Sequence, residues 1–239
     1  MDDLSKYSLM LKVSKNNCFL GQATGFAVKF GGKNYLVSNR HVLTGLDPFT
    51  NKPLSLEGDL PNAVSIRYNS PGTKPEPWHL QGEVLYKDGT ARWIDKKLGS
   101  EFADIAVLPL DFIPEQVKLY SLELPATPSE TVVTPGMPVY IIGYPAGITV
   151  GGGWPIWITG HIASDMELNH GGRPVFLINA SSAGGLSGSP VFTRFNGQTQ
   201  FLGVHSSELG SRESHESCIC VAWRSQILQE ILQSDVGGV

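Results

Sequence analysis

Short apolar segments recur along the whole chain, either alternating with polar residues or running continuously for a few positions. Each is bounded by Gly, Pro, Asn, Asp or Ser, which is the pattern of β-strands joined by turns. We expect strands at 8–14, 23–30, 33–39, 63–69, 105–110, 138–145, 156–164, 174–181, 188–195, 200–207 and 218–223. This spacing is typical of an all-β barrel or sandwich, and it does not fit alternating strands and helices.

A helical pattern occurs near the C-terminus, where Ile227, Ile231 and Leu232 form an apolar face. It predicts a short helix over about residues 223–234. The stretch 112–137 is dotted with prolines and weakly patterned. We therefore expect residues 116–136 to link an N-terminal unit, 1–115, to a C-terminal unit, 137–239.

Composition adds limits to the function. The chain has 239 residues, 41% of them hydrophobic and 17% charged, with a net charge of −4. This balance gives no electrostatic footprint for nucleic acid or for an anionic membrane surface, so neither is expected as a partner. The number of cysteines is odd, which does not fit a disulfide framework; they are Cys18, Cys218 and Cys220. With no signal peptide or membrane span visible in the sequence, we expect a cytoplasmic protein.

Three fragments carry candidate chemistry. SNRHVLTG places His41 after an apolar strand, EFADIAVLPL places Asp104 at the head of another, and GGLSGSP holds Ser187. A serine hydroxyl becomes a nucleophile when a histidine takes its proton and a carboxylate orients the imidazole. Small residues beside the serine let backbone N–H groups face inward, and we expect those of Gly185 and Ser187 to hold an oxyanion.

Other residues compete for two of these roles. Asp95 or Asp111 could support the histidine instead of Asp104, although the apolar strand that follows Asp104 favours Asp104. Ser189 is a second serine in the glycine-rich segment. We expect Ser189 to be structural, because the glycines are arranged around Ser187.

A zinc site is a further alternative, formed by His215, Cys218 and Cys220 with a distant His161 or His170. That spacing is not a known finger pattern, and buried free cysteines on a strand are the favoured interpretation. We therefore expect no metal and no cofactor.

The fragments SNRHVL, ADIAVL and GLSGSPVF resemble the three signature motifs of the chymotrypsin/trypsin-like serine peptidases, from about Gly21 to Trp223. The likeness is nearer to the bacterial, viral 3C-like, glutamyl endopeptidase and HtrA-like branches, without a PDZ domain. It implies two antiparallel six-stranded β-barrels with the site between them, followed here by the short helix. Leu186 stands where zymogen-type members carry aspartate, so activation by proteolytic trimming is not expected.

The same resemblance implies a substrate pocket. FLGVHSSE is similar to the strand that lines it, which assigns substrate binding to His205, Ser206 and Ser207, with Ser182 on the opposite wall. In glutamyl endopeptidases and 3C-like proteases a histidine here receives Glu or Gln at P1, the substrate residue before the scissile bond. Glu208 would repel a glutamate, so glutamine or another polar residue fits better.

Three functions remain to be compared. The first is an endopeptidase acting on a protein or peptide substrate. The second is an esterase-type hydrolase. That class typically carries Gly-x-Ser-x-Gly before a helix, whereas here residue 189, at the position of the last glycine, is serine. The third is a trypsin-like module that binds without catalysis. The sequence leaves the oligomeric state open.

Overall fold

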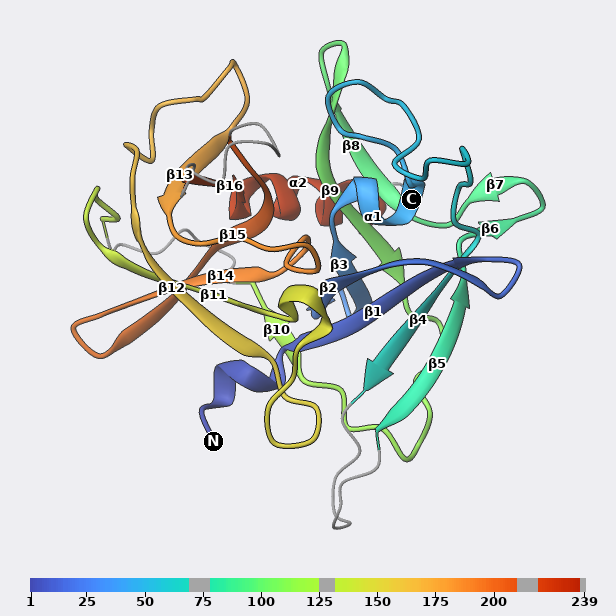
Figure 1. The fold of residues 1–239 in the computed structure, drawn as a ribbon. Helices are drawn as coiled ribbons and strands as arrows, with labels where there is room; N and C mark the ends of the chain where they lie inside the picture. Colours follow the sequence, from blue (N-terminus) through green and yellow to red (C-terminus); the bar gives the residue numbers. More distant parts are fainter. Residues whose placement is uncertain (69–77, 125–131, 210–218, 237–239) are drawn as a thin grey trace.

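The computed structural model of the protein describes residues 1–68, 78–124, 132–209 and 219–236. Two strand-rich parts lie side by side (Figure 1). We call the sheet built from the first half of the chain the first unit, and the barrel built from the second half the second barrel.

The first unit is an antiparallel sheet with the order β5-β4-β1-β2-β3-β9-β8. Its strands are β1 (Ser8–Lys15), β2 (Cys18–Phe30), β3 (Lys33–Ser38), β4 (Ala63–Tyr68), β5 (His79–Val84), β8 (Ile94–Leu98) and β9 (Glu101–Pro109). A small separate hairpin joins β6 (Tyr86–Lys87) to β7 (Thr90–Ala91). Because β5 and β8 end this order without pairing to each other in the described residues, the expected closure of the first unit into a six-stranded barrel is not confirmed.

The second barrel is closed, with the order β11-β12-β13-β16-β15-β14. Its strands are β11 (Pro138–Gly143), β12 (Ile156–Ile162), β13 (Val175–Asn179), β14 (Pro190–Phe195), β15 (Gln198–Glu208) and β16 (Ile219–Arg224). The helical elements in the described residues are η1 (Asp3–Lys6), α1 (Arg40–Thr44), η2 (Pro145–Gly147) and α2 (Ser225–Val236). The strand-rich pattern of the sequence and its C-terminal helix are therefore confirmed, the helix beginning at Ser225.

Part of the segment expected as a linker is itself a strand. Ser121–Glu123 form β10, which pairs in parallel with β2. The reason is tertiary, because the Leu122 side chain is buried in the core beside β2 and would otherwise remain in water.

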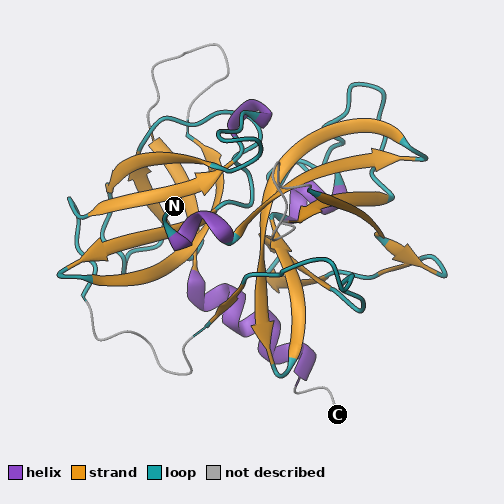
Figure 2. Cartoon of the chain, turned by 90° about the horizontal axis from the view of Figure 1, so that it is seen from below, coloured by secondary structure: helices purple, strands orange, loops and turns teal. Residues whose placement is uncertain are grey.

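One hydrophobic cluster joins the first unit to the second barrel. It combines Phe26 and Ile105 of the first unit with Val204 and Trp223 of the second barrel and Leu228 of α2, all buried. Figure 2 shows α2 lying across the boundary between the two parts. Two further clusters fill the first unit and the second barrel separately. The shared cluster fixes the two parts relative to each other, and side chains from both can therefore meet at their boundary.

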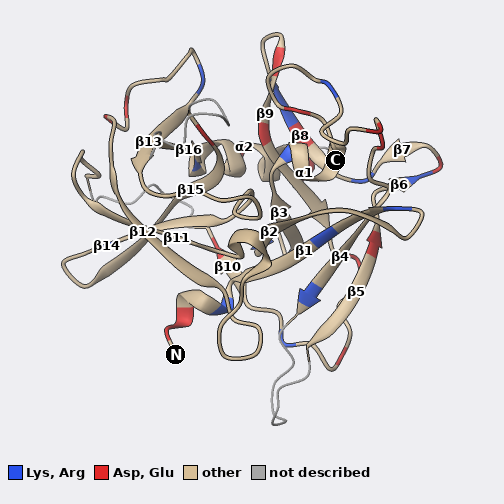
Figure 3. Cartoon of the chain, viewed as in Figure 1, with Lys and Arg blue, Asp and Glu red and all other residues tan. Residues whose placement is uncertain are grey.

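Basic and acidic residues are interspersed along the chain, and neither sign is confined to one part (Figure 3). In the portion of the chain that the structure describes, no helix has the length and apolar character needed to cross a membrane.

Candidate active site

His41 lies on the short helix α1, which follows β3. The helix stops early because Gly45 takes a left-handed conformation, with φ 70°, and its N–H donates to the carbonyl of His41. Before the helix, the side-chain amide of Asn39 donates to the carbonyl of Asp104 at 2.7 Å. These contacts hold His41 against β9.

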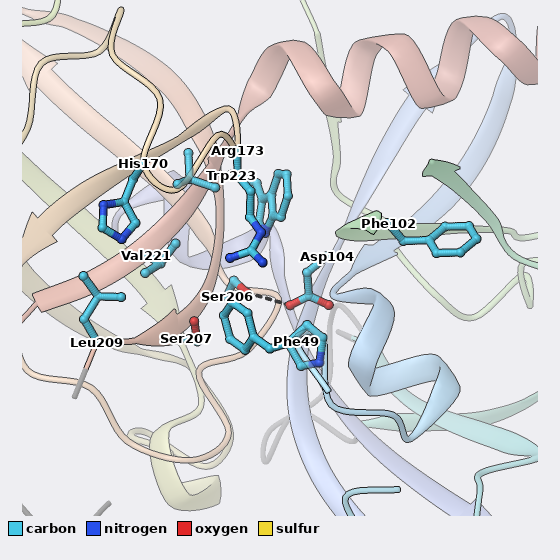
Figure 4. Close-up of a pocket in the computed structure, with 12 residues that line it drawn as sticks. Phe49, Phe102, Asp104, His170, Arg173, Ser206, Ser207, Leu209, Val221 and Trp223 are labelled. Atoms are coloured by element: carbon cyan, nitrogen blue, oxygen red, sulfur yellow. Dashed lines mark hydrogen bonds between the residues drawn. The ribbon is translucent and has the colours of Figure 1, made fainter. Parts of the chain in front are cut away.

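Asp104 lies on β9 with its carboxylate buried, and three donors reach it. The His41 backbone N–H donates to Oδ1 at 2.9 Å, and His41 Nδ1 lies 2.7 Å from Oδ2. The Ser206 hydroxyl of β15 also donates to Oδ2, at 2.6 Å (Figure 4). A carboxylate accepts and does not donate, so Nδ1 of His41 carries the proton and Nε2 is left free.

The other two aspartates have different partners. Asp95 accepts from Arg40 at 2.8 Å and from the Trp93 indole at 3.3 Å. Asp111 accepts from Arg92 at 3.0 Å. Of the three carboxylates that the sequence offered, the structure brings Asp104 to His41.

Ser187 lies on a tight loop between β13 and β14 that needs glycine at two positions. Gly185 and Gly188 have φ values of 98° and 84°, a region that side-chain-bearing residues rarely adopt. A Cβ at Gly188 would overlap the carbonyl oxygen of Thr24 and the hydroxyl of Ser38. The Thr24 N–H, from β2 in the first unit, donates to the carbonyl of Ser187 at 2.9 Å. The loop is therefore clamped against the first unit.

Ser187 and His41 line the same cavity, which has a volume of about 310 Å³. The Ser187 hydroxyl donates to the carbonyl of Ser206 at 3.3 Å, and no hydrogen bond joins it to the His41 ring. Such bonds are often absent without substrate, and a turn about the Cα–Cβ bond is the motion that redirects a hydroxyl. Ser189 is fully buried and does not line this cavity, in keeping with a structural role.

The N–H groups of Gly185 and Ser187 donate to no other residue that the structure describes. The carbonyls around them are occupied. That of Gly184 accepts from the Ala146 N–H at 2.6 Å, and that of Gly185 accepts from the Thr24 hydroxyl at 2.7 Å. The loop thus has two unpaired donors beside Ser187.

His205 is 1% exposed, and its ring is neutral at physiological pH. Burial lowers the pKa of His205 to about 4, only partly opposed by the backbone carbonyl of Leu186. That carbonyl lies 3.2 Å from Nδ1 and must accept from it, so Nε2 is left as an acceptor. Nε2 is buried and has no partner among the described residues.

Ser206 and Ser207 line a second, smaller cavity together with Asp104 (Figure 4). Its apolar wall includes Phe49 and Trp223. Ser182 is partly exposed and lines neither of these two cavities.

Residues of the alternative metal site are not assembled where the structure describes them. Cys220 is buried, and its thiol lies 3.2 Å from the carbonyl of Ala180. His215 and Cys218 lie outside the described residues. Among the described residues no group of His, Cys, Asp and Glu is placed to hold a metal ion.

Sequence reasoning missed two residues that hold the Ser187 loop, Thr24 and Ala146. Thr24 had a signal in the sequence, since it is a polar residue within an apolar strand. The structure shows that it is fully buried. Ala146 had none, because its role comes from its backbone, whose φ of 49° emerges only in the folded chain.

The geometry agrees with the comparisons. Residues 23–204 match the family of trypsin-like peptidase domains, and the chain belongs to this family. No curated protein matches the sequence.

Several solved structures share its fold. An HtrA-type protease with a tripeptide is 14% identical with a TM-score of 0.61, over 98% of this chain and 61% of the other. A protease from M. tuberculosis in its active form is 19% identical with a TM-score of 0.53, over 96% of this chain and 80% of the other. The serine endoprotease from Yersinia pestis is 12% identical with a TM-score of 0.59, over 98% and 64%. The chain thus spans about three fifths of the first and third of these, and at such identities the likeness concerns the fold.

The pKa values of the two histidines are expected to be shifted in opposite directions from the ordinary value, that of His41 upward and that of His205 downward. Burial lowers the pKa of His41, but the charge and hydrogen bond of Asp104 outweigh it, so the pKa is raised. A pH titration followed by ¹⁵N NMR of the rings should show His41 losing its proton above pH ~6.5, and His205 staying neutral down to about pH 4. A His205 that gains its proton above pH ~6 would contradict the buried, neutral ring described here.

Proposed function

We propose that the protein is a serine endopeptidase, with Ser187 as the nucleophile, His41 as the general base and Asp104 as the carboxylate that orients His41. The observation that carries the proposal is the pair of contacts from Asp104 to His41, which fixes the tautomer and leaves Nε2 free. Membership of the trypsin-like peptidase family and the cavity shared by His41 and Ser187 support it.

In the proposed reaction, the Ser187 oxygen attacks the scissile carbonyl carbon and its proton passes to His41 Nε2. The N–H groups of Gly185 and Ser187 bind the oxyanion of the tetrahedral intermediate. The C–N bond then breaks, the departing amine takes the proton from His41, and water releases the acyl group by the same steps. Because a protonated ring cannot accept the proton, turnover rises with pH as His41 deprotonates.

One observation favours a second candidate, a trypsin-like module that binds peptides without cleaving them. The Ser187 hydroxyl is hydrogen-bonded to the Ser206 carbonyl and not to His41. If that arrangement persists with substrate bound, the hydroxyl is not activated.

A fluorophosphonate probe separates the two candidates, because it reacts only with an activated serine. We expect the wild-type chain to be labelled at pH 8 and Ser187→Ala to be unlabelled. Ser189→Ala is the matched control. It also removes a serine hydroxyl oxygen, two residues along the chain, but from a buried residue that does not line the cavity. It should be labelled like the wild type. An unlabelled wild-type chain, or a label that survives Ser187→Ala, would contradict the endopeptidase proposal.

The substrate residue at P1 is proposed to be glutamine, received by His205 with Ser182 on the opposite wall and Ser206 and Ser207 along the substrate backbone. His205 is neutral, and its Nε2 is an acceptor without a partner among the described residues. Because this atom is buried and His205 lines neither described cavity, a glutamine side chain reaches it only when the wall around His205 opens. The side-chain amide of glutamine can donate to that acceptor, whereas the carboxylate of glutamate cannot.

A peptide library that varies the P1 residue tests this preference. We expect kcat/KM for Gln to exceed that for Glu by about 100-fold or more at neutral pH, because a buried polar atom would be left unpaired with Glu. In His205→Leu the difference between Gln and Glu should collapse. A preference for Arg, Phe or Glu at P1 would contradict the assignment of His205.

A further inference from the structure

The turn Tyr144–Gly147, between β11 and β12, lies directly against the loop that carries Ser187. Its Ala146 N–H donates to the carbonyl of Gly184 at 2.6 Å. The Tyr144 carbonyl lies so close to Gly185 that a Cβ there would overlap it. The two segments are therefore packed backbone to backbone.

This contact determines which way the amide of Gly185 points. A trans peptide carries its N–H and C=O on opposite sides. Because the carbonyl of Gly184 is held by Ala146, the Gly185 N–H of the same peptide is turned the other way, and it has no acceptor among the described residues. Rotation of this peptide would exchange the N–H for a carbonyl oxygen, which repels an oxyanion.

We propose that Ala146 is a positioning residue for the oxyanion site, acting through the Gly184 carbonyl that its N–H holds. The inference rests on the proposed endopeptidase function and deepens it. Ala146 acts through its backbone N–H, and its effect is to keep the Gly185 N–H available as a donor.

The backbone of Ala146 is unusual in a way that its side chain does not explain. Its φ and ψ are 49° and 23°, in the left-handed region that costs energy for residues other than Gly, Asn and Asp. The side chain is exposed, so no packing contact accounts for this conformation. Strained backbone of this kind persists where the surroundings impose it, and it clusters at functional sites.

The surroundings that impose it come from both parts of the molecule. The Tyr144 N–H donates to the hydroxyl of Thr24 at 3.0 Å, and that hydroxyl in turn donates to the Gly185 carbonyl. Thr24 belongs to β2 of the first unit and is fully buried. One side chain thus ties the turn, the Ser187 loop and the first unit together.

The far end of the same connection is also attached to the first unit. The Gly152 carbonyl accepts from the Trp78 indole at 2.6 Å and from the Arg67 guanidinium at 3.0 Å. A Cβ at Gly153 would overlap the Trp78 ring. The segment from Tyr144 to Gly153 is therefore held at both ends, which limits the freedom of Ala146 between them.

The test changes the backbone preference at residue 146 while leaving its exposed surroundings alone. Ala146→Val places a branched side chain in the left-handed region, whereas Ala146→Asn introduces a residue that tolerates it. Asn196 is the matched control. It has the same φ of 49°, in the exposed turn between β14 and β15, so Asn196→Val places a branched side chain in the left-handed region away from the site.

We expect Ala146→Val to lower kcat by about tenfold to 1,000-fold, where the upper value corresponds to complete loss of one oxyanion donor. KM should stay within about threefold of the wild-type value. The affinity for a peptide aldehyde, whose adduct carries the oxyanion, should fall by the same factor as kcat/KM. Ala146→Asn should keep wild-type kinetics, and Asn196→Val should keep them although its Tm falls. If Ala146→Val does not fold, Ala146→Leu replaces it.

Two outcomes would overturn the inference in distinguishable ways. An active wild-type chain with an equally active Ala146→Val, or a loss of activity that Asn196→Val reproduces, would contradict the role of Ala146 alone. A wild-type chain that neither cleaves peptides nor reacts with fluorophosphonate would contradict the proposed function, and this inference with it.

Discussion

The buried carboxylate of Asp104 is the interaction on which the site depends. It accepts from the backbone and the ring of His41 on the first unit and from the Ser206 hydroxyl on the second barrel. A buried charge is tolerated when donors surround it, and here the donors come from both parts of the molecule. The hydrogen bonds that stabilise the buried carboxylate therefore also orient the His41 imidazole and hold β15 beside it.

Thr24 plays the corresponding role for the Ser187 loop. Its N–H, hydroxyl and carbonyl contact Ser187, Gly185 and Ser38 respectively, and its hydroxyl also accepts from Tyr144. A loop rich in glycine would otherwise have many conformations, so a fixed neighbour has to select one of them. The shared hydrophobic cluster around Leu228 and Trp223 keeps that neighbour in place. The geometry of the site is thus a property of the boundary between the two parts, and neither part contains it alone.

Much of this could be predicted from the sequence, for identifiable reasons. Alternation of apolar and polar residues marks strands, and it predicted an all-β chain with a C-terminal helix. His41, Asp104 and Ser187 stood out because each adjoins an apolar strand. The structure brings His41 into contact with Asp104 and places Ser187 in the same cavity as His41. The choice between Asp104 and Asp95 was open, because it depends on Arg40 engaging Asp95, a contact between α1 and β8 that spacing does not encode.

Other features lay beyond local patterns. Closure of the first unit is not confirmed in the described residues, and pairing of its edge strands depends on the whole sheet and not on any one segment. The strand at Ser121–Glu123 is short and proline-flanked in sequence, and it forms because β2 offers a free edge. Ala146 acquires its importance from a backbone angle and a single N–H, which no side-chain pattern records.

A crystal structure of the protein with a peptide boronic acid would test the central claim most directly. The account predicts a covalent bond from the Ser187 oxygen to boron, with one boronate oxygen within hydrogen-bonding distance of the Gly185 and Ser187 N–H groups. It also predicts that the His41 ring faces the adduct while still bonded to Asp104. A boron atom bound elsewhere, or an adduct whose oxygen meets a carbonyl in place of these two amides, would contradict it.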